Sequence, residues 1–128
     1  MEVSPLGGES YEIAVRGHRI VVDQPASEGG EDTAPTPTEL FVGSLASCVA
    51  FYAGRYLSRH GYDRTGLTVT ADSAMGEGRP ARVGAIKITV KVPTDLPEER
   101  HAAFLAVARA CTVHNTLHVP PAVEIELQ

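Results

Sequence analysis

One long apolar stretch, from Thr36 to Gly61, constrains the fold of this chain more than any other. Thr36 can cap a helix, Pro37 suits the first helical position because no N–H is needed there, and Glu39 completes a capping box with Thr36. Gly61 marks the end of the helix. Its apolar residues cover nearly the whole circumference: Leu40, Phe41, Val42, Leu45, Ala46, Cys48, Val49, Ala50, Phe51, Tyr52, Ala53, Tyr56 and Leu57. A helix that is apolar all round is buried on all sides.

Burying this helix takes more protein than one chain offers. A domain of 128 residues buries only about two-thirds of the surface of its unfolded chain, so little is left to enclose a central helix. We therefore expect a homodimer in which a second copy completes the cover and the helix is nearly free of solvent.

Composition narrows the classes of function. The chain has 16 acidic and 11 basic residues and a net charge of −5, which argues against nucleic acid or an anionic membrane as a partner. The first ten residues show no signal-peptide pattern, and no long uninterrupted apolar run ends in a charged flank. We expect a single cytoplasmic domain over residues 1–128 that needs no cofactor.

Apolar periodicity predicts the other elements. In chain order with the long helix they are strands 10–16 and 19–22, joined by a turn at Gly17-His18; the helix 36–61; strands 67–72 and 83–92; a helix capped by Asp95 and running to Cys111; a helical turn at 115–118; and a closing strand 123–127. The order β-β-α-β-β-α-β indicates an α+β fold with antiparallel sheet packed on helices. Residues 26–35 form the longest loop, and loops of that length are usually functional or disordered.

The two cysteines lie on apolar helical faces far apart in the sequence. Cys48 is in the middle of the first helix and Cys111 is at the end of the second, so only the fold can bring them together. In a cytosolic chain a cysteine pair is more often catalytic or redox-active than structural. Free cysteine is also among the most buried residue types, so both thiols could simply be packed in the core. A buried thiol becomes a nucleophile only where a cation stabilises the thiolate.

Two motifs make a more specific pattern. The run PTPTELFVGSLASC from Pro35 to Cys48, the run CTVHNTL from Cys111 to Leu117, and the apolar alternation at 123–127 together resemble the OsmC/Ohr family, the osmotically inducible and organic hydroperoxide resistance proteins. The resemblance covers nearly the whole chain. It implies an OsmC-like fold, in which the long central helices of an intertwined dimer are enclosed by antiparallel sheets from both subunits.

The same resemblance implies an activity, the thiol-dependent reduction of organic hydroperoxides. Cys48 resembles the peroxidatic thiol, which attacks the peroxide and becomes a sulfenic acid, and Cys111 resembles the resolving thiol, which closes a disulfide. The implied partners are a small organic hydroperoxide and an external dithiol reductant of the lipoyl type.

The chain departs from the family pattern in the groups around the thiol. Thr38 stands where the family has a Glu that holds an Arg beside the thiolate, and Glu39 follows one residue later, about 100° round the helix. The Arg is absent after Gly7-Gly8, where Glu9 stands, and Thr112 replaces the usual Pro. These differences indicate the broader OsmC-like branch and a slower peroxidase.

Four side chains are candidates for the missing cation: Arg16, Arg19, Arg55 and His114. Arg55 follows Cys48 by two helical turns and so lies on the same face. It is also a typical surface arginine near a helix end. His114 follows Cys111 closely, so it could pair with either thiol or serve as a structural histidine.

Two other classes of function remain open. Zinc favours sulfur and nitrogen ligands, and Cys111, His114 and His118, with His60 and Cys48, contain both. Alternatively, the dimer binds a small apolar ligand between its central helices without catalysis, and the thiols only pack there.

Overall fold

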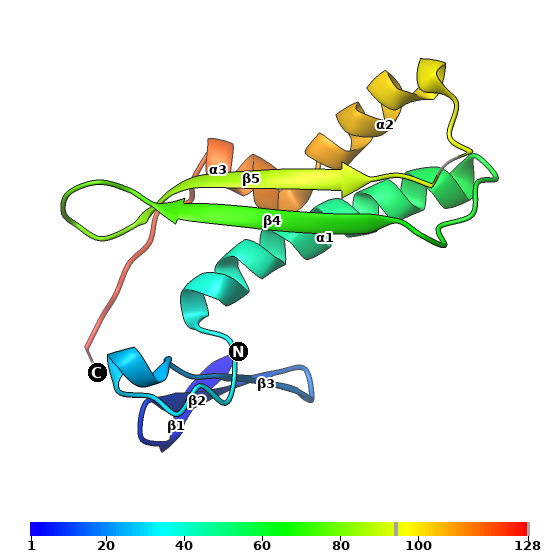
Figure 1. Ribbon diagram of the computed structural model, residues 1–128. Helices are drawn as coiled ribbons and strands as arrows, with labels where there is room; N and C mark the ends of the chain where they lie inside the picture. The colour runs from blue at the N-terminus through cyan, green and yellow to red at the C-terminus, as the bar shows by residue number, and fades with distance from the viewer. Residues whose placement is uncertain (94, 128) are drawn as a thin grey trace. The chain divides into compact units, whose positions relative to one another are not determined.

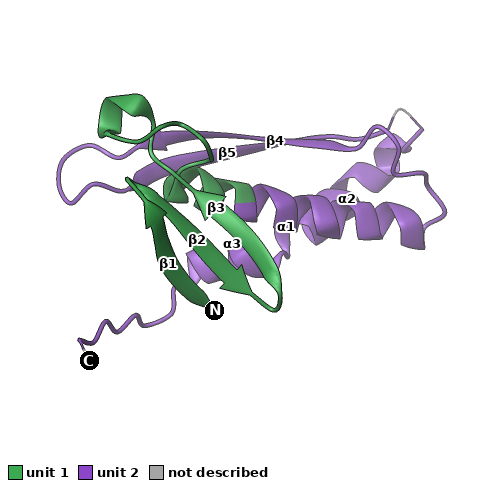
Figure 2. Cartoon of the chain, turned by 90° about the horizontal axis from the view of Figure 1, so that it is seen from below, with its two compact units in different colours: residues 1–43 green, residues 44–128 purple. Residues whose placement is uncertain are grey.

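The computed structural model describes residues 1–93 and 95–127. The chain divides into two compact units, residues 1–43 and 44–128, which Figure 2 colours green and purple. Unit 1 holds a small sheet, a loop and the first turns of the long helix. Unit 2 holds the rest of that helix, a hairpin and two further helices. The single domain expected over residues 1–128 stays a prediction.

Unit 1 contains a three-stranded antiparallel sheet in the order β1-β2-β3. Its strands are β1 (Glu2–Gly7), β2 (Ser10–Val15) and β3 (His18–Val22). The second and third strands were predicted, whereas β1 was not. Its sequence lacks an alternating apolar pattern, and Pro5 is a residue that sheets accept mainly at an edge, which is where β1 lies.

The turn between β2 and β3 consists of Arg16 and Gly17, one residue earlier than predicted. Both have positive φ, 49° and 81°, as the two central residues of a type I′ turn require. This turn pairs Val15 with His18, and the register places Ile13 opposite Ile20 and opposite Val3 on β1. On that face Ile20 is 38% exposed and Val3 57% exposed, so the chain leaves part of an apolar sheet face uncovered.

The loop after β3 is ordered around one buried carboxylate. Asp23 is only 2% exposed. It accepts hydrogen bonds from the backbone N–H groups of Gln24 (2.8 Å), Glu31 (3.3 Å) and Thr33 (3.1 Å), and from the Thr33 hydroxyl (2.8 Å). A one-turn 3₁₀ helix, η1 (Ala26–Glu28), lies within the loop. The polar sequence therefore specifies a structured loop.

Helix α1 (Pro37–Arg59) begins with the predicted capping box. The Thr36 N–H donates to Glu39 Oε2 (2.8 Å), and the Glu39 N–H donates to Thr36 Oγ1 (3.1 Å). At the other end the Tyr62 N–H donates back to the Leu57 carbonyl (2.9 Å). Gly61 sits between them with a φ of 78°, which is the Schellman arrangement. The boundaries differ from the prediction by one or two residues at each end.

Burial of α1 is confined to one side in the single chain. Leu45, Val49 and Ala53 are buried, whereas Phe41 is 39% and Phe51 59% exposed. The expected burial on all sides is therefore wrong for one chain taken alone. By length and composition α1 could also cross a membrane, a test that core helices of globular proteins pass as well.

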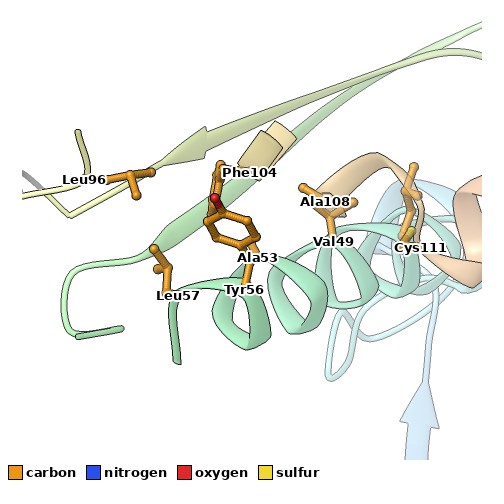
Figure 3. Packing of buried hydrophobic residues seen from close by; sticks show 9 residues of the cluster. Val49, Ala53, Tyr56, Leu57, Leu96, Phe104, Ala108 and Cys111 are labelled. Carbon is orange, nitrogen blue, oxygen red and sulfur yellow. The ribbon is translucent and has the colours of Figure 1, made fainter. Parts of the chain in front are cut away.

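Unit 2 packs a hairpin and two helices around the second part of α1. The hairpin consists of β4 (Thr68–Met75) and β5 (Val83–Lys91), and the helices are α2 (Glu98–Arg109) and α3 (Thr112–His118). Figure 1 shows β4 and β5 as one long antiparallel ribbon. The core, shown in Figure 3, joins α1 to α2 and to the start of α3: Leu45, Val49, Ala53, Tyr56, Leu57, Leu96, Phe104, Ala108 and Cys111.

Two predictions for the last third of the chain are wrong. Asp95 does not cap α2, because the helix begins at Glu98 with Pro97 as its N-cap and no side-chain cap. The strand expected at 123–127 is absent from the described chain: residues 120–127 have no regular secondary structure, and Ile125 is 94% exposed. A strand needs a neighbour for its backbone hydrogen bonds, and the single chain provides none for this segment.

Candidate active site

The fold of unit 2 brings the two cysteines together. Cys48 lies on α1 beside the core residue Val49 and is half-buried. Cys111 follows α2 and is fully buried against the same core, and Figure 3 shows it beside α1. Cys48 is close enough to Cys111 to raise the pKa of its thiol. The two thiols therefore lie near one another within unit 2, and their roles stay a prediction.

Cys111 is held by the helix that follows it. It is the N-cap of α3, and its Sγ accepts a hydrogen bond from the His114 N–H at 3.3 Å. A small thiol suits this position because it can be buried and can accept a bond from a free helix N–H at the same time. The sequence pattern predicts Cys111 at the end of the second helix, whereas in the structure it is the N-cap of α3.

The two thiols have different surroundings. Burial raises the pKa of the Cys111 thiol, the neighbouring Cys48 thiol raises it further, and the hydrogen bond from His114 opposes both. Cys111 is therefore protonated in the resting protein at neutral pH. Cys48, half-buried, is the more accessible of the two.

The candidate cations in unit 2 have other contacts. The Arg55 guanidinium lies over the Phe51 ring, 5.9 Å from its centroid, which is a cation–π arrangement. The His114 ring bonds through Nδ1 to the Arg109 carbonyl at 2.6 Å, and the His114 backbone N–H bonds to Cys111 Sγ. Both side chains are near the cysteines in sequence and are engaged elsewhere in the structure.

The other candidates belong to unit 1. Glu39 serves the capping box, where hydrogen bonds from Thr36 lower its pKa, and Thr38 is exposed in the first turn of α1. Arg19 forms an ion pair with Glu12 on the neighbouring strand, and Arg16 occupies the β2–β3 turn. Glu39, Arg19 and Arg16 therefore each have a role in the local structure of unit 1.

A pocket of about 250 Å³ lies in unit 2 between α1, β5 and the junction of α2 and α3. Its walls are mostly apolar, with Val49, Ile88 and Ala108 among them, and Arg109 and His114 supply its polar groups. Val49 directly follows Cys48 in the chain, but neither Cys48 nor Cys111 is among the residues that line the pocket. Arg109 was not predicted, because it belongs to no motif and only its place in the pocket identifies it.

A metal centre gains no support from the geometry. Within residues 1–93 and 95–127, no three side chains of the His, Cys, Asp or Glu type converge as a metal site would require. His114 and His118 are in ring contact, with centroids 4.4 Å apart. His60 instead stacks on the Tyr56 ring, and both residues lie on or next to α1, far from His114 and His118 in the sequence.

Comparison with known proteins identifies the family. Residues 29–126 match the family described as OsmC-like protein. No curated protein matches the sequence significantly. Among solved structures, one from Psychrobacter arcticus is provisionally described as an osmotic stress induced and detoxification response protein. It is 26% identical to this chain, with a TM-score of 0.81, and the match covers 90% of this chain and 85% of that one.

Two further solved structures share the fold at lower identity. A Legionella pneumophila organic hydroperoxide resistance protein OsmC is 18% identical, with a TM-score of 0.60 over 89% of this chain and 91% of that one. A Vibrio cholerae protein provisionally named for organic hydroperoxide resistance, with captopril in one of its active sites, is 17% identical, with a TM-score of 0.68 over 92% and 83%. The family match over most of the chain, together with this shared fold, shows that the chain belongs to the OsmC-like protein family.

Proposed function

We propose that this protein reduces organic hydroperoxides with the thiols of Cys48 and Cys111. The observation that carries the proposal is the pairing itself: two cysteines distant in sequence meet in the core of unit 2, one half-buried and one fully buried. Membership of a family that includes named hydroperoxide resistance proteins agrees with it.

The reaction balances with these two thiols and one external dithiol. The Cys48 thiol loses its proton, the thiolate attacks the terminal peroxide oxygen, the O–O bond breaks, and the alkoxide takes up a proton and leaves as the alcohol. Cys48 is now a sulfenic acid. The Cys111 thiol then loses its proton, its thiolate attacks Cys48 Sγ, the S–O bond breaks, the hydroxide takes up a proton and leaves as water, and a disulfide forms. Exchange with a dithiol, of the lipoyl type in our proposal, restores both thiols and oxidises the donor.

The surroundings of the thiols support this division of roles. A peroxide reaches a half-buried thiol more easily than a fully buried one, which favours Cys48 for the first step. Cys111, protonated and bound to the His114 N–H, does not compete for the peroxide because the thiolate is the nucleophile.

The pocket beside α1 supports a small, mainly apolar substrate. Its volume of about 250 Å³ is below the range of drug-sized sites, roughly 300–1,000 Å³, so it suits a short alkyl or single-ring group. The same pocket is the specific observation that favours the second candidate function, binding of a small apolar ligand without catalysis.

Exposed apolar residues support a homodimer as the working form. Ile20 and Val3 on the sheet of unit 1, Phe51 on α1, and Ile125 in the C-terminal segment are all exposed in the single chain. Surfaces of this kind commonly mark an interface. We propose that a second copy covers them, that the segment 123–127 finds a strand partner in it, and that the dimer works in the cytoplasm.

Steady-state turnover tests the proposal. Purified protein is mixed with cumene hydroperoxide and reduced lipoamide, and peroxide loss is followed alongside the intact mass of the protein. We expect multiple turnovers, with a Cys48–Cys111 disulfide accumulating when the dithiol is withheld. Protein whose thiols are blocked beforehand is the control. Stable free thiols in the presence of excess peroxide, combined with saturable binding of cumyl alcohol, would favour the ligand-binding function instead.

A further inference from the structure

One hydrogen bond links the two segments that carry the thiols. The Tyr52 hydroxyl and Thr112 Oγ1 are 3.3 Å apart, and either oxygen can donate. Tyr52 follows Cys48 by one turn of α1, so both point to the same side of the helix. Thr112 directly follows Cys111. The bond thus joins α1 to the start of α3 at positions next to both cysteines.

A short segment between two helices carries Cys111. Only Ala110 and Cys111 separate the end of α2 at Arg109 from the start of α3 at Thr112. The Ala110 N–H bonds back to α2 at the Ala106 carbonyl (3.2 Å), which anchors the segment to its own helix. The Tyr52 bond anchors it to α1, where Cys48 lies.

Disulfide formation places a demand on this anchor. The Cys111 Sγ must release the His114 N–H (3.3 Å) and turn to attack Cys48 Sγ. Cβ atoms in a disulfide lie about 3.5–4.5 Å apart, so the backbone beside Cys111 has to stay close to α1 while the thiol turns. The proline that the family pattern usually has at position 112 would offer no hydroxyl group to Tyr52.

We propose that Tyr52 and Thr112 are positioning residues that hold Cys111 within reach of Cys48. Their hydrogen bond raises the effective concentration of Cys111 at Cys48, and it therefore sets both the rate of the resolving step and the stability of the disulfide. The part that concerns the resolving step rests on the proposed function, whereas the disulfide equilibrium does not.

The test compares variants that remove or keep the hydroxyl groups. Tyr52→Phe and Thr112→Val each delete one partner, and Thr112→Ser keeps it. Ser47→Ala is the matched control, because the Ser47 hydroxyl donates a hydrogen bond within α1, to the Ser44 carbonyl (3.0 Å). Two quantities are measured in folded protein: the disulfide fraction in buffers of oxidised and reduced dithiothreitol, and the rate at which Cys48 sulfenic acid disappears after one equivalent of cumene hydroperoxide.

We expect Tyr52→Phe and Thr112→Val each to weaken the disulfide and to slow the resolving step by about threefold to tenfold, the effect of one ordinary hydrogen bond. The double variant should lose no more than either single one, because both remove the same bond. Thr112→Ser and Ser47→Ala should behave as wild type, and formation of the sulfenic acid should be unchanged in all variants.

The inference is overturned if Tyr52→Phe and Thr112→Val leave both quantities within a factor of about two of wild type, if Thr112→Ser loses as much as Thr112→Val, or if no Cys48–Cys111 disulfide forms in the redox buffers. Failure of the proposed function gives a different result: wild-type protein forms no sulfenic acid with peroxide, while the disulfide equilibrium in the redox buffers still responds to the variants as expected.

Discussion

The two units of this chain are stabilised in different ways. Unit 2 buries a connected apolar cluster that runs from Leu45 to Cys111. Unit 1, among its described residues, buries Val22 and Val42 together with the charged Asp23, and it leaves an apolar sheet face exposed. Unit 2 therefore has the packing needed to hold two thiols in fixed positions. Unit 1 instead exposes apolar surface of the kind that commonly marks an interface.

The largest effect should come from the core of unit 2. Phe104 is 2% exposed and packs edge-on against Tyr56, so Phe104→Ala should lower the free energy of unfolding by about 3–5 kcal/mol. The next residue, Leu105, is 41% exposed and is the matched control. Leu105→Ala should cost far less in the same denaturant titration. Equal losses would mean that this cluster does not carry the stability of unit 2.

The uncovered face of unit 1 gives the next largest effect. Ile20→Glu places a charge where we propose that a second copy packs, and it should raise the dimer dissociation constant at least about 100-fold. Ser27→Glu adds the same charge at an exposed loop position and should leave association unchanged. Sedimentation velocity over a concentration series measures both. A wild-type protein that stays monomeric at micromolar concentration would refute the dimer.

Much of the secondary structure of both units could be predicted from local patterns in the sequence. The Thr36–Glu39 capping box, the hairpin strands and the long helix follow from side-chain spacing, which acts over a few residues. The strand expected at 123–127 failed because alternation shows that a segment can pair but not which chain supplies the neighbour. The structured loop was missed because nothing in the sequence around Asp23 shows that its carboxylate is buried.

Asp23 gives a smaller, pH-dependent effect in unit 1. Hydrogen bonds, the largest from Thr33, lower its pKa. A lowered pKa in the folded state stabilises the protein above the ordinary Asp pKa of about 3.9, and this stability is lost as the pH falls through the folded value. Asp23→Asn should therefore lower the melting temperature at pH 7, on the order of 5 °C.

The acid limb of the melting curve is the check on Asp23. The difference between wild type and Asp23→Asn should shrink as the pH is lowered and disappear once the wild-type carboxylate is protonated. Glu28→Gln, an exposed carboxylate in the same loop, is the control and should melt as wild type throughout. A difference for Asp23→Asn that did not vary with pH would show that its ionised hydrogen bonds are not the cause.

The raised pKa of Cys111 should be visible in the pH dependence of the resolving step. Burial raises the pKa of its thiol, and only the thiolate attacks the sulfenic acid. The rate of disulfide formation in stopped-flow experiments should therefore keep rising with pH beyond the ordinary thiol pKa of about 8.5. An inflection well below that value would mean that a cation close to Cys111 stabilises its thiolate.

The site was only partly accessible from the sequence. The choice of Cys48 and Cys111 came from the family motifs, because each cysteine alone also fits a packing role. Their meeting, and the Tyr52–Thr112 bond beside them, depend on how α1 packs against the start of α3. Tyr52 and Thr112 are distant in sequence, so no local pattern pairs their hydroxyl groups.

The most direct test of the account is a single-turnover comparison of Cys48→Ser and Cys111→Ser with one equivalent of cumene hydroperoxide. Only the first thiol is needed to cleave the O–O bond. Cys111→Ser should therefore consume one peroxide per site and stop at a sulfenic acid that dimedone traps on Cys48, and Cys48→Ser should consume none. Equal loss of the first turnover in both variants, or unchanged peroxide consumption in Cys48→Ser, would contradict the assigned roles.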